Sequence, residues 1–325
     1  MKGAFKKMRV PACALLLAAG IFAAVCFFPA AGESMPPAAE AAVLRLWHID
    51  GFEGGVGSRA VFLRSAARKF ADGGGAYVLV TAQTAESARA ALAAGDVPDM
   101  ISCGGDNSFA AGYAAPLQGY AFAAAEAGGQ TLAVPWCRGA YLLFSADGDF
   151  SDMNAQNTVY SQGRGAHPAA AAWFAGLRGV SGLPAGEAAA ALMRGDRTYM
   201  LGTQRDVQRF SARSFAVQVR PVREYCDLWQ YILVTAASAH YASCLDFIGY
   251  LLSADVQRGR ACLGMLGAFG EVYEEGSALY GAWRAPARTL PAWADAEALR
   301  EADALAEAAL AGDENAAKKL ENRTV

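Results

Sequence analysis

The chain has 325 residues, enough for a large core and more than one lobe. Hydrophobic residues make up 54% and charged residues 18%, and much of the apolar fraction is alanine, which favours closely packed helices over a membrane channel. A net charge of −3 and a pI near 5.7 provide no basic field to hold nucleic acid, so we expect no nucleic-acid partner.

The N-terminal segment has the layout of an export signal. Cations precede an almost unbroken apolar run over residues 11–31, and Ala30-Ala31-Gly32 offers a cleavage site. We therefore assign residues 1–32 to a signal peptide and residues 33–42 to a linker. An uncleaved membrane anchor is the alternative, because the apolar run is long. A lipid on Cys26 is a weaker alternative, since a valine stands before it where a small residue is wanted.

Three short apolar segments, separated by two helical patterns, follow the linker. Val43–Trp47, Ala76–Ala82 and Asp99–Cys103 are typical of buried strands. Ser58 stands where a side chain caps the start of a helix through about Phe70, and Thr84–Ala94 is typical of an alanine-rich helix that ends at Gly95. The order β-α-β-α-β predicts neighbouring parallel strands in one covered sheet.

The stretch Thr131–Ser145 (TLAVPWCRGAYLLFS) predicts two extended segments that meet at a kink after Pro135-Trp136. An aromatic ring, an arginine and a tyrosine therefore gather where strands end, and open α/β sheets bind ligands at strand ends. Further strands are predicted at Tyr199–Thr203, Phe215–Val222 and Trp229–Thr235, and helices at Ala242–Leu252, from Ser253, and in the tail after Pro291 as one helix or a pair.

Motifs for catalysis, cofactors and metals are weak. Gly55–Ala60 matches G-x-G-x-x-A, but the next strand ends without the carboxylate that would hold a ribose, so we expect no cofactor. The cysteines and the three histidines show no metal-ligand spacing, and no nucleophile motif occurs. We therefore expect no catalytic residue and no metal, although a carboxylate pair set only by distance in space remains open.

Six segments, in this order, carry a resemblance to a known family: VLRLWHIDGFEGG, LAAGDVPDMIS, GGQTLAVPWCRGAYLLFS, YMLGTQRD, ILVTAASAHYASCLDFIGYLLSADVQRG and LGAFGEVYEE. With them the chain resembles the family 1 extracellular solute-binding proteins of bacterial ABC importers, most like the sugar-binding members. The chain is shorter than usual for that family, chiefly in the second lobe, and Gly73-Gly74-Gly75 replaces the usual Asn-Pro-Gly before the second strand.

The resemblance implies an α/β, two-lobed periplasmic-binding-protein-like fold of type II, with a hinge and a ligand cleft between the lobes. Lobe I would comprise residues 43–138 and 229–280, and lobe II residues 139–228 and 281–325 with the C-terminal helices.

We predict that the ligand contacts residues at or near strand ends, where the family places it. These are Trp47, Asp50, Asp106, Trp136, Arg138, Tyr141, Gln204, Arg205, Asp206, Trp229 and Trp293. Flat aromatic rings with polar edges suit a sugar. The alternative is that the tryptophans fill the core and the arginines form salt bridges between lobes. Truncating Trp136 should weaken affinity more than stability only if its ring lines an open cleft.

We therefore expect a monomeric, exported receptor, periplasmic or on the extracellular face of the membrane, that captures a small solute, most plausibly a carbohydrate. It would deliver the solute to the permease subunits of an ABC transporter and would not be an enzyme. Two alternatives stay open: an exported enzyme acting on glycans, and a sensing accessory protein that binds a solute without transport.

Overall fold

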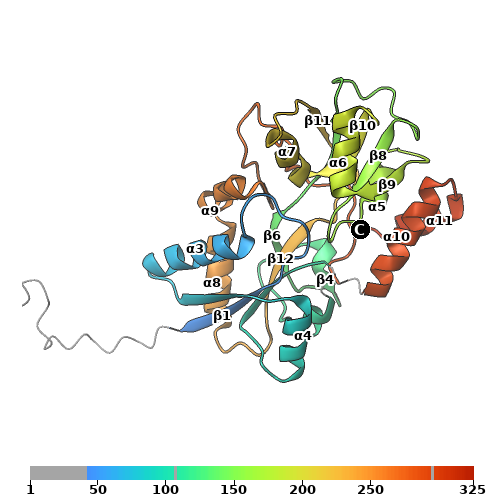
Figure 1. Cartoon of the computed structure of the whole chain (residues 1–325). Coiled ribbons are helices and arrows are strands. Elements are labelled where there is room, and N and C mark those ends of the chain that lie inside the picture. The colour runs from blue at the N-terminus through green and yellow to red at the C-terminus, as the bar shows by residue number, and fades with distance from the viewer. Residues whose placement is uncertain (1–41, 106–107, 294–295) are drawn as a thin grey trace, which may run out of the picture. The chain divides into compact units, whose positions relative to one another are not determined.

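Two mixed β-sheets organise the part of the chain that the computed structural model describes, residues 42–105, 108–293 and 296–325 (Figure 1). Residues 42–325 group into one unit by their contacts. The expected signal peptide, the linker up to residue 41, Cys26 and the candidate ligand residue Asp106 lie outside the described residues. Within the described ranges, no helix is both long and apolar enough to span a bilayer.

The six-stranded sheet contains the three strands predicted to be neighbours. Its strands are β1 (Val43–His48), β2 (Tyr77–Ala82), β3 (Met100–Gly104), β6 (Val134–Arg138), β12 (Trp229–Val234) and β13 (Leu266–Gly267), in the spatial order β13-β6-β12-β3-β1-β2. β1 pairs in parallel with β2 on one side and with β3 on the other, which confirms the prediction. The carboxyl ends of these three strands therefore meet at one edge of the sheet.

Helices cover both faces of the six-stranded sheet. They are α3 (Arg59–Asp72), α4 (Ala85–Ala93), α8 (Tyr241–Leu252) and α9 (Ala254–Arg258). Side chains alternate along β1, so Leu44 and Leu46 pack in the cluster that contains α3 and α8, whereas Trp47 packs on the face covered by α4. The Ser58 side chain caps α3, which confirms the prediction. Thr84 is predicted to lie in the helix that follows β2, and its side chain instead caps α4, which begins at Ala85.

The five-stranded sheet is built by the chain between residues 141 and 221. Its strands are β7 (Tyr141–Ser145), β8 (Thr158–Gln162), β9 (Ser181–Pro184), β10 (Tyr199–Thr203) and β11 (Gln218–Pro221), in the order β11-β7-β10-β8-β9, with helices α5 (Pro168–Phe174), α6 (Ala185–Arg194) and α7 (Gln204–Ser211). β10 has its predicted bounds. β11 is shorter than the predicted Phe215–Val222, because the Phe215 N–H closes the end of α7 on the Phe210 carbonyl.

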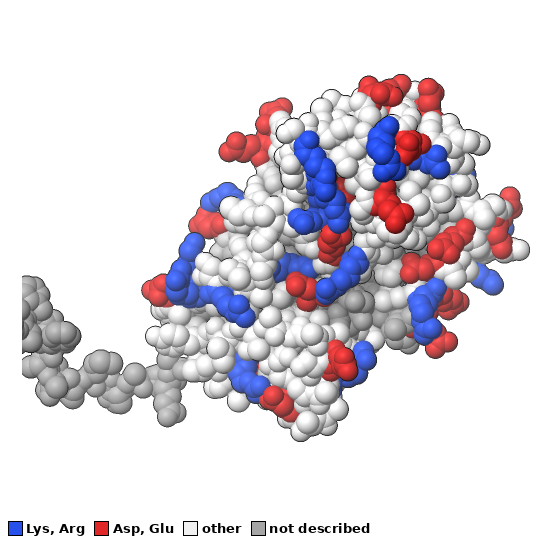
Figure 2. All heavy atoms as spheres, viewed as in Figure 1, with Lys and Arg blue, Asp and Glu red and all other residues white. Residues whose placement is uncertain are grey.

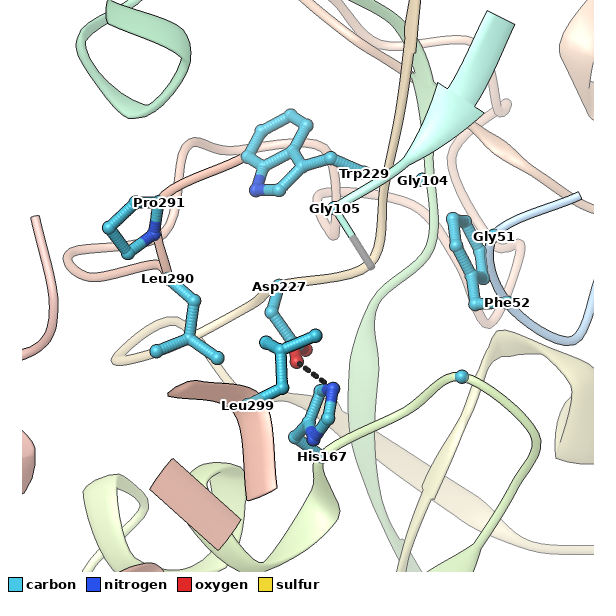
Figure 3. A pocket seen from close by; sticks show the side chains of 11 residues that line it. Gly51, Phe52, Gly104, Gly105, His167, Asp227, Trp229, Leu290, Pro291 and Leu299 are labelled. Carbon is cyan, nitrogen blue, oxygen red and sulfur yellow. Dashed lines mark ion pairs between the residues drawn. The ribbon is translucent and has the colours of Figure 1, made fainter. Parts of the chain in front are cut away.

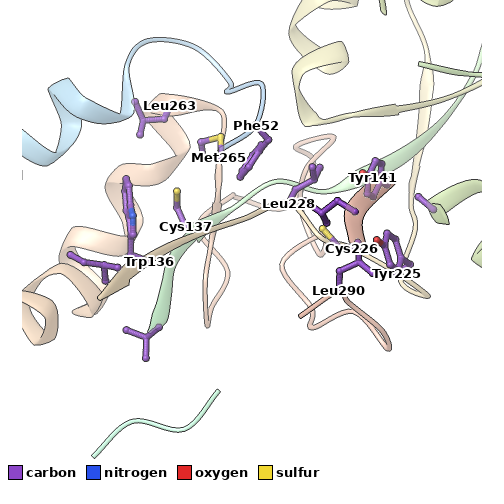
Figure 4. Close-up of a cluster of buried hydrophobic side chains, with 14 of the residues drawn as sticks. Phe52, Trp136, Cys137, Tyr141, Tyr225, Cys226, Leu228, Leu263, Met265 and Leu290 are labelled. Atoms are coloured by element: carbon purple, nitrogen blue, oxygen red, sulfur yellow. The ribbon is translucent and has the colours of Figure 1, made fainter. Parts of the chain in front are cut away.

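The chain passes between the two sheets through residues 139–140 and residues 222–228. The two passages touch, since the Gly139 N–H donates to the Leu228 carbonyl at 2.7 Å. One buried apolar cluster runs through them, and its members include Trp136, Cys137, Leu228, Tyr141 and Tyr225 (Figure 4). We call the parts built on the six-stranded and five-stranded sheets lobe I and lobe II; the expected residue boundaries of these lobes stay a prediction.

The remaining elements join and cover the sheets. β4 (Glu126–Ala127) and β5 (Gln130–Thr131) form a short hairpin, and 3₁₀ turns occupy Ser108–Tyr113, Ala123–Ala125 and Gly259–Leu263. The tail forms a pair of helices, α10 (Ala296–Leu310) and α11 (Glu314–Asn322), one of the two arrangements predicted for it. α10 packs against α5 and so joins the C-terminal tail to lobe II (Figure 1).

Candidate functional site

Two adjoining cavities lie where the ends of β1 and β2 face the loop after β8. The large cavity, of about 330 Å³, is lined by His48, Ile49, Asp50, Gly51, Ala82, Gln83, Thr84, Ala85, Arg164 and Gly165. The small cavity, of about 20 Å³, is lined by Gly51, Phe52, Gly104, Gly105, Gly165, His167, Asp227, Trp229, Leu290, Pro291 and Leu299. They share Gly51 of lobe I and Gly165 of lobe II, so both are candidates for a cleft between lobes.

Close approach of two glycines separates the cavities. A Cβ atom on Gly165 would lie 2.0 Å from the carbonyl oxygen of Gly51, and Gly165 has a φ of +66°. Both the space and the backbone conformation therefore require glycine at this position. Next to this contact, the Glu53 N–H donates to the Arg164 carbonyl at 2.8 Å.

Asp50 is the acidic side chain in the described lining of the large cavity, which also includes Arg164, and buried side chains hold Asp50 in place. Its Oδ1 accepts hydrogen bonds from His48 Nε2 at 2.9 Å and from Arg59 Nε at 2.8 Å. The His48 side chain is 1% exposed, whereas that of Asp50 is 49% exposed. The hydrogen bond from His48, with help from Arg59, holds the pKa of Asp50 below its usual value, so the carboxylate is ionised.

The hydrogen bonds around Ser102 determine the tautomer of His48. Trp136 Nε1 and Gln230 Nε2 both donate to Ser102 Oγ, at 2.9 and 3.2 Å. The Ser102 hydroxyl must then donate to His48 Nδ1, 3.0 Å away, which leaves the imidazole proton on Nε2 facing Asp50. Burial lowers the pKa of His48, in keeping with a neutral ring.

A serine, a histidine and an aspartate in one chain of hydrogen bonds invite comparison with a hydrolase triad. Here Ser102 is fully buried. Both lone pairs of its hydroxyl oxygen are occupied by the donors from Trp136 and Gln230, so none remains for attack on a substrate. The arrangement therefore orients Asp50 and does not present a nucleophile.

A second polar cluster borders the small cavity (Figure 3). The Tyr141 hydroxyl donates to Asp227 Oδ1 at 2.8 Å and accepts the His167 N–H at 2.8 Å. His167 Nδ1 bonds Asp303 Oδ1 at 2.7 Å, and its Nε2 lies 3.9 Å from Asp227 Oδ2. Burial raises the pKa of Asp227, and the charge of His167 opposes that shift.

Contacts between the lobes gather on Glu53, in the glycine-rich loop after β1. Arg209 Nη2 lies 2.5 Å from the Glu53 carboxylate, and Arg205 Nε lies 3.6 Å from it. Arg205 also donates to the Gly55 carbonyl at 2.8 Å, and Gln204 Nε2 reaches the Glu53 carbonyl at 3.4 Å. Figure 2 shows basic and acidic side chains meeting in the middle of this face, below α7.

The predicted ligand residues are therefore divided among several places. Asp50 lines the large cavity, Trp229 lines the small one, and Tyr141 is bound directly to the Asp227 carboxylate of the small one. Gln204 and Arg205 lie at the contact between lobes. Asp206 is buried and accepts the Thr203 N–H in the capping box that begins α7.

Four further predicted ligand residues do not line the described parts of either cavity. Trp47 is buried on the α4 face, and the partly buried Trp293 packs near Tyr231. Trp136 is fully buried behind Ser102. Arg138 is buried over the Trp229 ring and donates to the carbonyls of Ala282 and Arg284 at 2.5 and 2.7 Å. These buried positions match the alternative in which the tryptophans fill the core. A ligand role for any of the predicted residues stays a prediction.

Sequence reasoning missed His167, Asp227 and Phe52. Asp227 stands two residues before the predicted strand at Trp229, and His167 stands just before a proline that starts α5. Either position is a strand or helix boundary and could have been weighed as such. No local sequence pattern connects His167 with Asp227, because they meet only through the hydroxyl of Tyr141, which is distant from both in the sequence.

No metal centre is indicated in the described residues, where no group of three or more histidine, cysteine or acidic side chains could hold an ion. The five cysteines of this part are free. Four are buried, as expected of small apolar side chains, and Cys262 is exposed.

No known family model matches the sequence, and no curated protein matches it either. Solved structures do match. The maltose-maltodextrin binding protein of Alicyclobacillus acidocaldarius is 15% identical, with a TM-score of 0.56 over 87% of this chain and 99% of that one. The sugar-binding protein MalE of Xanthomonas citri is 14% identical, with a TM-score of 0.58 over 87% and 96%. Iron-bound HitA of Pseudomonas aeruginosa is 14% identical, with a TM-score of 0.52 over 83% and 99%.

These likenesses define the class of fold. The chain has the α/β fold of the two-lobed periplasmic binding proteins, as the sequence predicts. At identities this low the likeness concerns the fold, and the ligand must be argued from the site itself.

Proposed function

We propose that the protein is an exported solute-binding receptor that captures a small carbohydrate between its lobes and delivers it to the permease of an ABC transporter. The observation that carries the proposal is the pair of cavities at the strand ends, each lined by residues of both lobes. In a two-lobed protein, a ligand held there is enclosed when the lobes close.

The chemistry of the cavities supports a polar, uncharged solute. Asp50 uses Oδ1 for both of its protein partners, so Oδ2 can accept hydrogen bonds from ligand hydroxyls. The large cavity falls within the range of about 300–1,000 Å³ typical of small-molecule sites. The rings of Phe52 and Trp229 line the small cavity, and apolar groups there suit the C–H groups at the end of a sugar.

Calorimetric titration with glucose, maltose, maltotriose and maltotetraose tests the proposal. We expect saturable binding of at least one of these sugars, and Asp50→Asn should weaken it about 10–150-fold, since a hydrogen bond to a charged group contributes about 1.5–3 kcal/mol. Asp147→Asn is the matched control, because Asp147 is exposed in the loop after β7. Absence of binding by every sugar would contradict the carbohydrate proposal.

Tryptophan fluorescence gives a second readout. Ligand binding should change the emission of Trp229, which lines the small cavity. Trp229→Phe should therefore remove most of the change, whereas Trp173→Phe, on α5 beside Arg178, should leave it.

Two observations separate the alternatives. Chromatography of each sugar after long incubation should show no product; a product that disappears in Asp50→Asn would instead favour a glycan-acting enzyme. Genes for two permeases beside this gene would favour transport, and a histidine-kinase gene would favour sensing.

A further inference from the structure

One carboxylate oxygen of the small cavity has no hydrogen-bond donor among the residues that the structure describes. Asp227 Oδ2 is buried and accepts no hydrogen bond within the described residues. A buried carboxylate oxygen in this condition is costly, because it has lost water without gaining a donor. The carboxyl group borders the small cavity, and Figure 3 shows it facing His167 there.

The neighbours of Asp227 are engaged elsewhere. The Tyr141 hydroxyl donates its only proton to Oδ1. The 3.9 Å between His167 Nε2 and Oδ2 is too long for a hydrogen bond, and His167 Nδ1 bonds Asp303. The described part of the chain thus leaves the second oxygen without a hydrogen-bond donor.

His167 is the one cation-capable side chain in the described lining, and its ring is engaged by the Asp303 carboxylate at 2.7 Å. The other described lining residues besides Asp227 are four glycines and the apolar side chains Phe52, Trp229, Leu290, Pro291 and Leu299, with no lysine or arginine. The volume of about 20 Å³ is room for about one water-sized group. The cavity can therefore receive the tip of a ligand but not a whole ring.

We infer that the small cavity is an end-group subsite, in which Asp227 accepts a hydrogen bond from one terminal hydroxyl or ammonium of the solute and rejects a terminal carboxylate. This inference rests on the proposed function and adds the class of ligand. A neutral or cationic donor satisfies Oδ2, whereas an anionic group would be desolvated beside a like charge, which weakens its binding.

Four sugars that differ only at the carbon-6 end group test the inference: glucose, 6-amino-6-deoxyglucose, 6-deoxyglucose and glucuronate. Calorimetry with the unaltered protein should find glucose and the amino sugar bound. The methyl of 6-deoxyglucose should weaken affinity about 10-fold or more, because it leaves Oδ2 unpaired. Glucuronate should bind about 100-fold more weakly than glucose or not at all.

Asp227→Asn supplies the matched variant, since the amide keeps an acceptor for Tyr141 and removes the charge. The ratio of glucose to glucuronate affinity should fall to about 10-fold or less, while Asp147→Asn should keep the ratio of the unaltered protein.

Comparable binding of glucuronate and glucose would overturn the inference, as would an unchanged ratio in Asp227→Asn. Binding of maltose or a longer sugar without any binding of the four hexoses would overturn it too, and would leave the proposed function standing. If no sugar of either panel binds, the carbohydrate proposal and the inferred end-group subsite are both contradicted.

Discussion

The two carboxylates of the cleft, Asp50 and Asp227, differ in how the protein surrounds them. Asp50 is half exposed and held by two donors on one oxygen, and its pKa lies below the usual value. Asp227 is buried at a passage between lobes, with one oxygen unbonded and a raised pKa. Asp50 of lobe I is thus a preorganised anion before any ligand binds. Asp227, in the passage between lobes, is stabilised most when a ligand donor reaches its unbonded oxygen.

The largest expected effect concerns Trp136, which holds Asp50 in place through Ser102 and His48. Trp136→Ala should lower the free energy of unfolding by about 3–5 kcal/mol, as truncation of buried aromatic residues commonly does. Its ring stacks on Phe62, lies beneath the Arg260 guanidinium and donates to Ser102, so packing and a hydrogen bond are both lost. Urea unfolding measures this, and Phe269→Ala is the control because Phe269 is exposed. A small stability change with a large loss of affinity would place Trp136 in the cleft instead.

The contact that separates the two carboxylates can be broken at one residue. Gly165→Ala should weaken affinity for the best-bound sugar by about 2–3 kcal/mol, roughly 30–150-fold, because the new Cβ would collide with the Gly51 carbonyl and hold the lobes apart. Gly176→Ala is the matched control: Gly176 also has a positive φ, of +85°, but nothing lies within 4 Å of its Cβ position. Equal losses of affinity in both variants would mean that backbone strain, rather than the lobe contact, sets the effect.

Much of the fold follows from local signals. The strand Tyr199–Thr203 and the Ser58 cap at the start of α3 are both predicted from the sequence, because these features depend on residues close in sequence. The placement of functional groups at strand ends finds Asp50 and Trp229 in the same way.

The rest of the candidate site depends on distant partners. Trp136 and Trp229 both follow the same strand-end rule, yet only Trp229 lines a cavity, because Ser102 takes the indole N–H of Trp136. Asp227 and His167 meet through Tyr141, which lies in another strand. No local sequence pattern predicts contacts between residues this far apart in the chain. The burial of Trp136 and the pairing of Asp227 with His167 are therefore visible only in the structure.

Acidification should act on the two carboxylates in opposite directions. The depressed pKa of Asp50 gives stability that is present above its unfolded pKa of about 3.9 and is lost as the pH falls through the folded value. The raised pKa of Asp227 does the reverse, so stability is gained as the pH falls from above that value towards about 3.9.

Urea unfolding of Asp50→Asn and Asp227→Asn across about pH 3–7 measures both effects. Asp227→Asn should lack the gain in stability that the unaltered protein obtains from Asp227 on acidification. Asp50→Asn should lose less stability than the unaltered protein below about pH 4. The Asp227 effect should be the larger, because Asp50 is half exposed and solvent screens its interactions. If the two substitutions changed the pH dependence of the free energy of unfolding in the same direction, Asp50 and Asp227 would not differ as we propose.

The smallest effect concerns the ion pair that joins the lobes beside both carboxylates. Glu53→Gln should weaken sugar affinity by about 0.5–1 kcal/mol, roughly 2–5-fold, because the pair stabilises the closed arrangement but is partly exposed. The cost stays low because Arg209 keeps its second partner, Asp206 at 2.5 Å. Titrations at about 0.01 M and 1 M salt should show a weaker salt dependence in the variant than in the unaltered protein. Glu126→Gln, at an exposed hairpin residue, is the control. If both variants keep the salt dependence of the unaltered protein, the charges of Glu53 and Arg209 do not contribute to closure, and the Gly51–Gly165 contact and the hydrogen bonds of Arg205 and Gln204 to backbone carbonyls must hold the lobes instead.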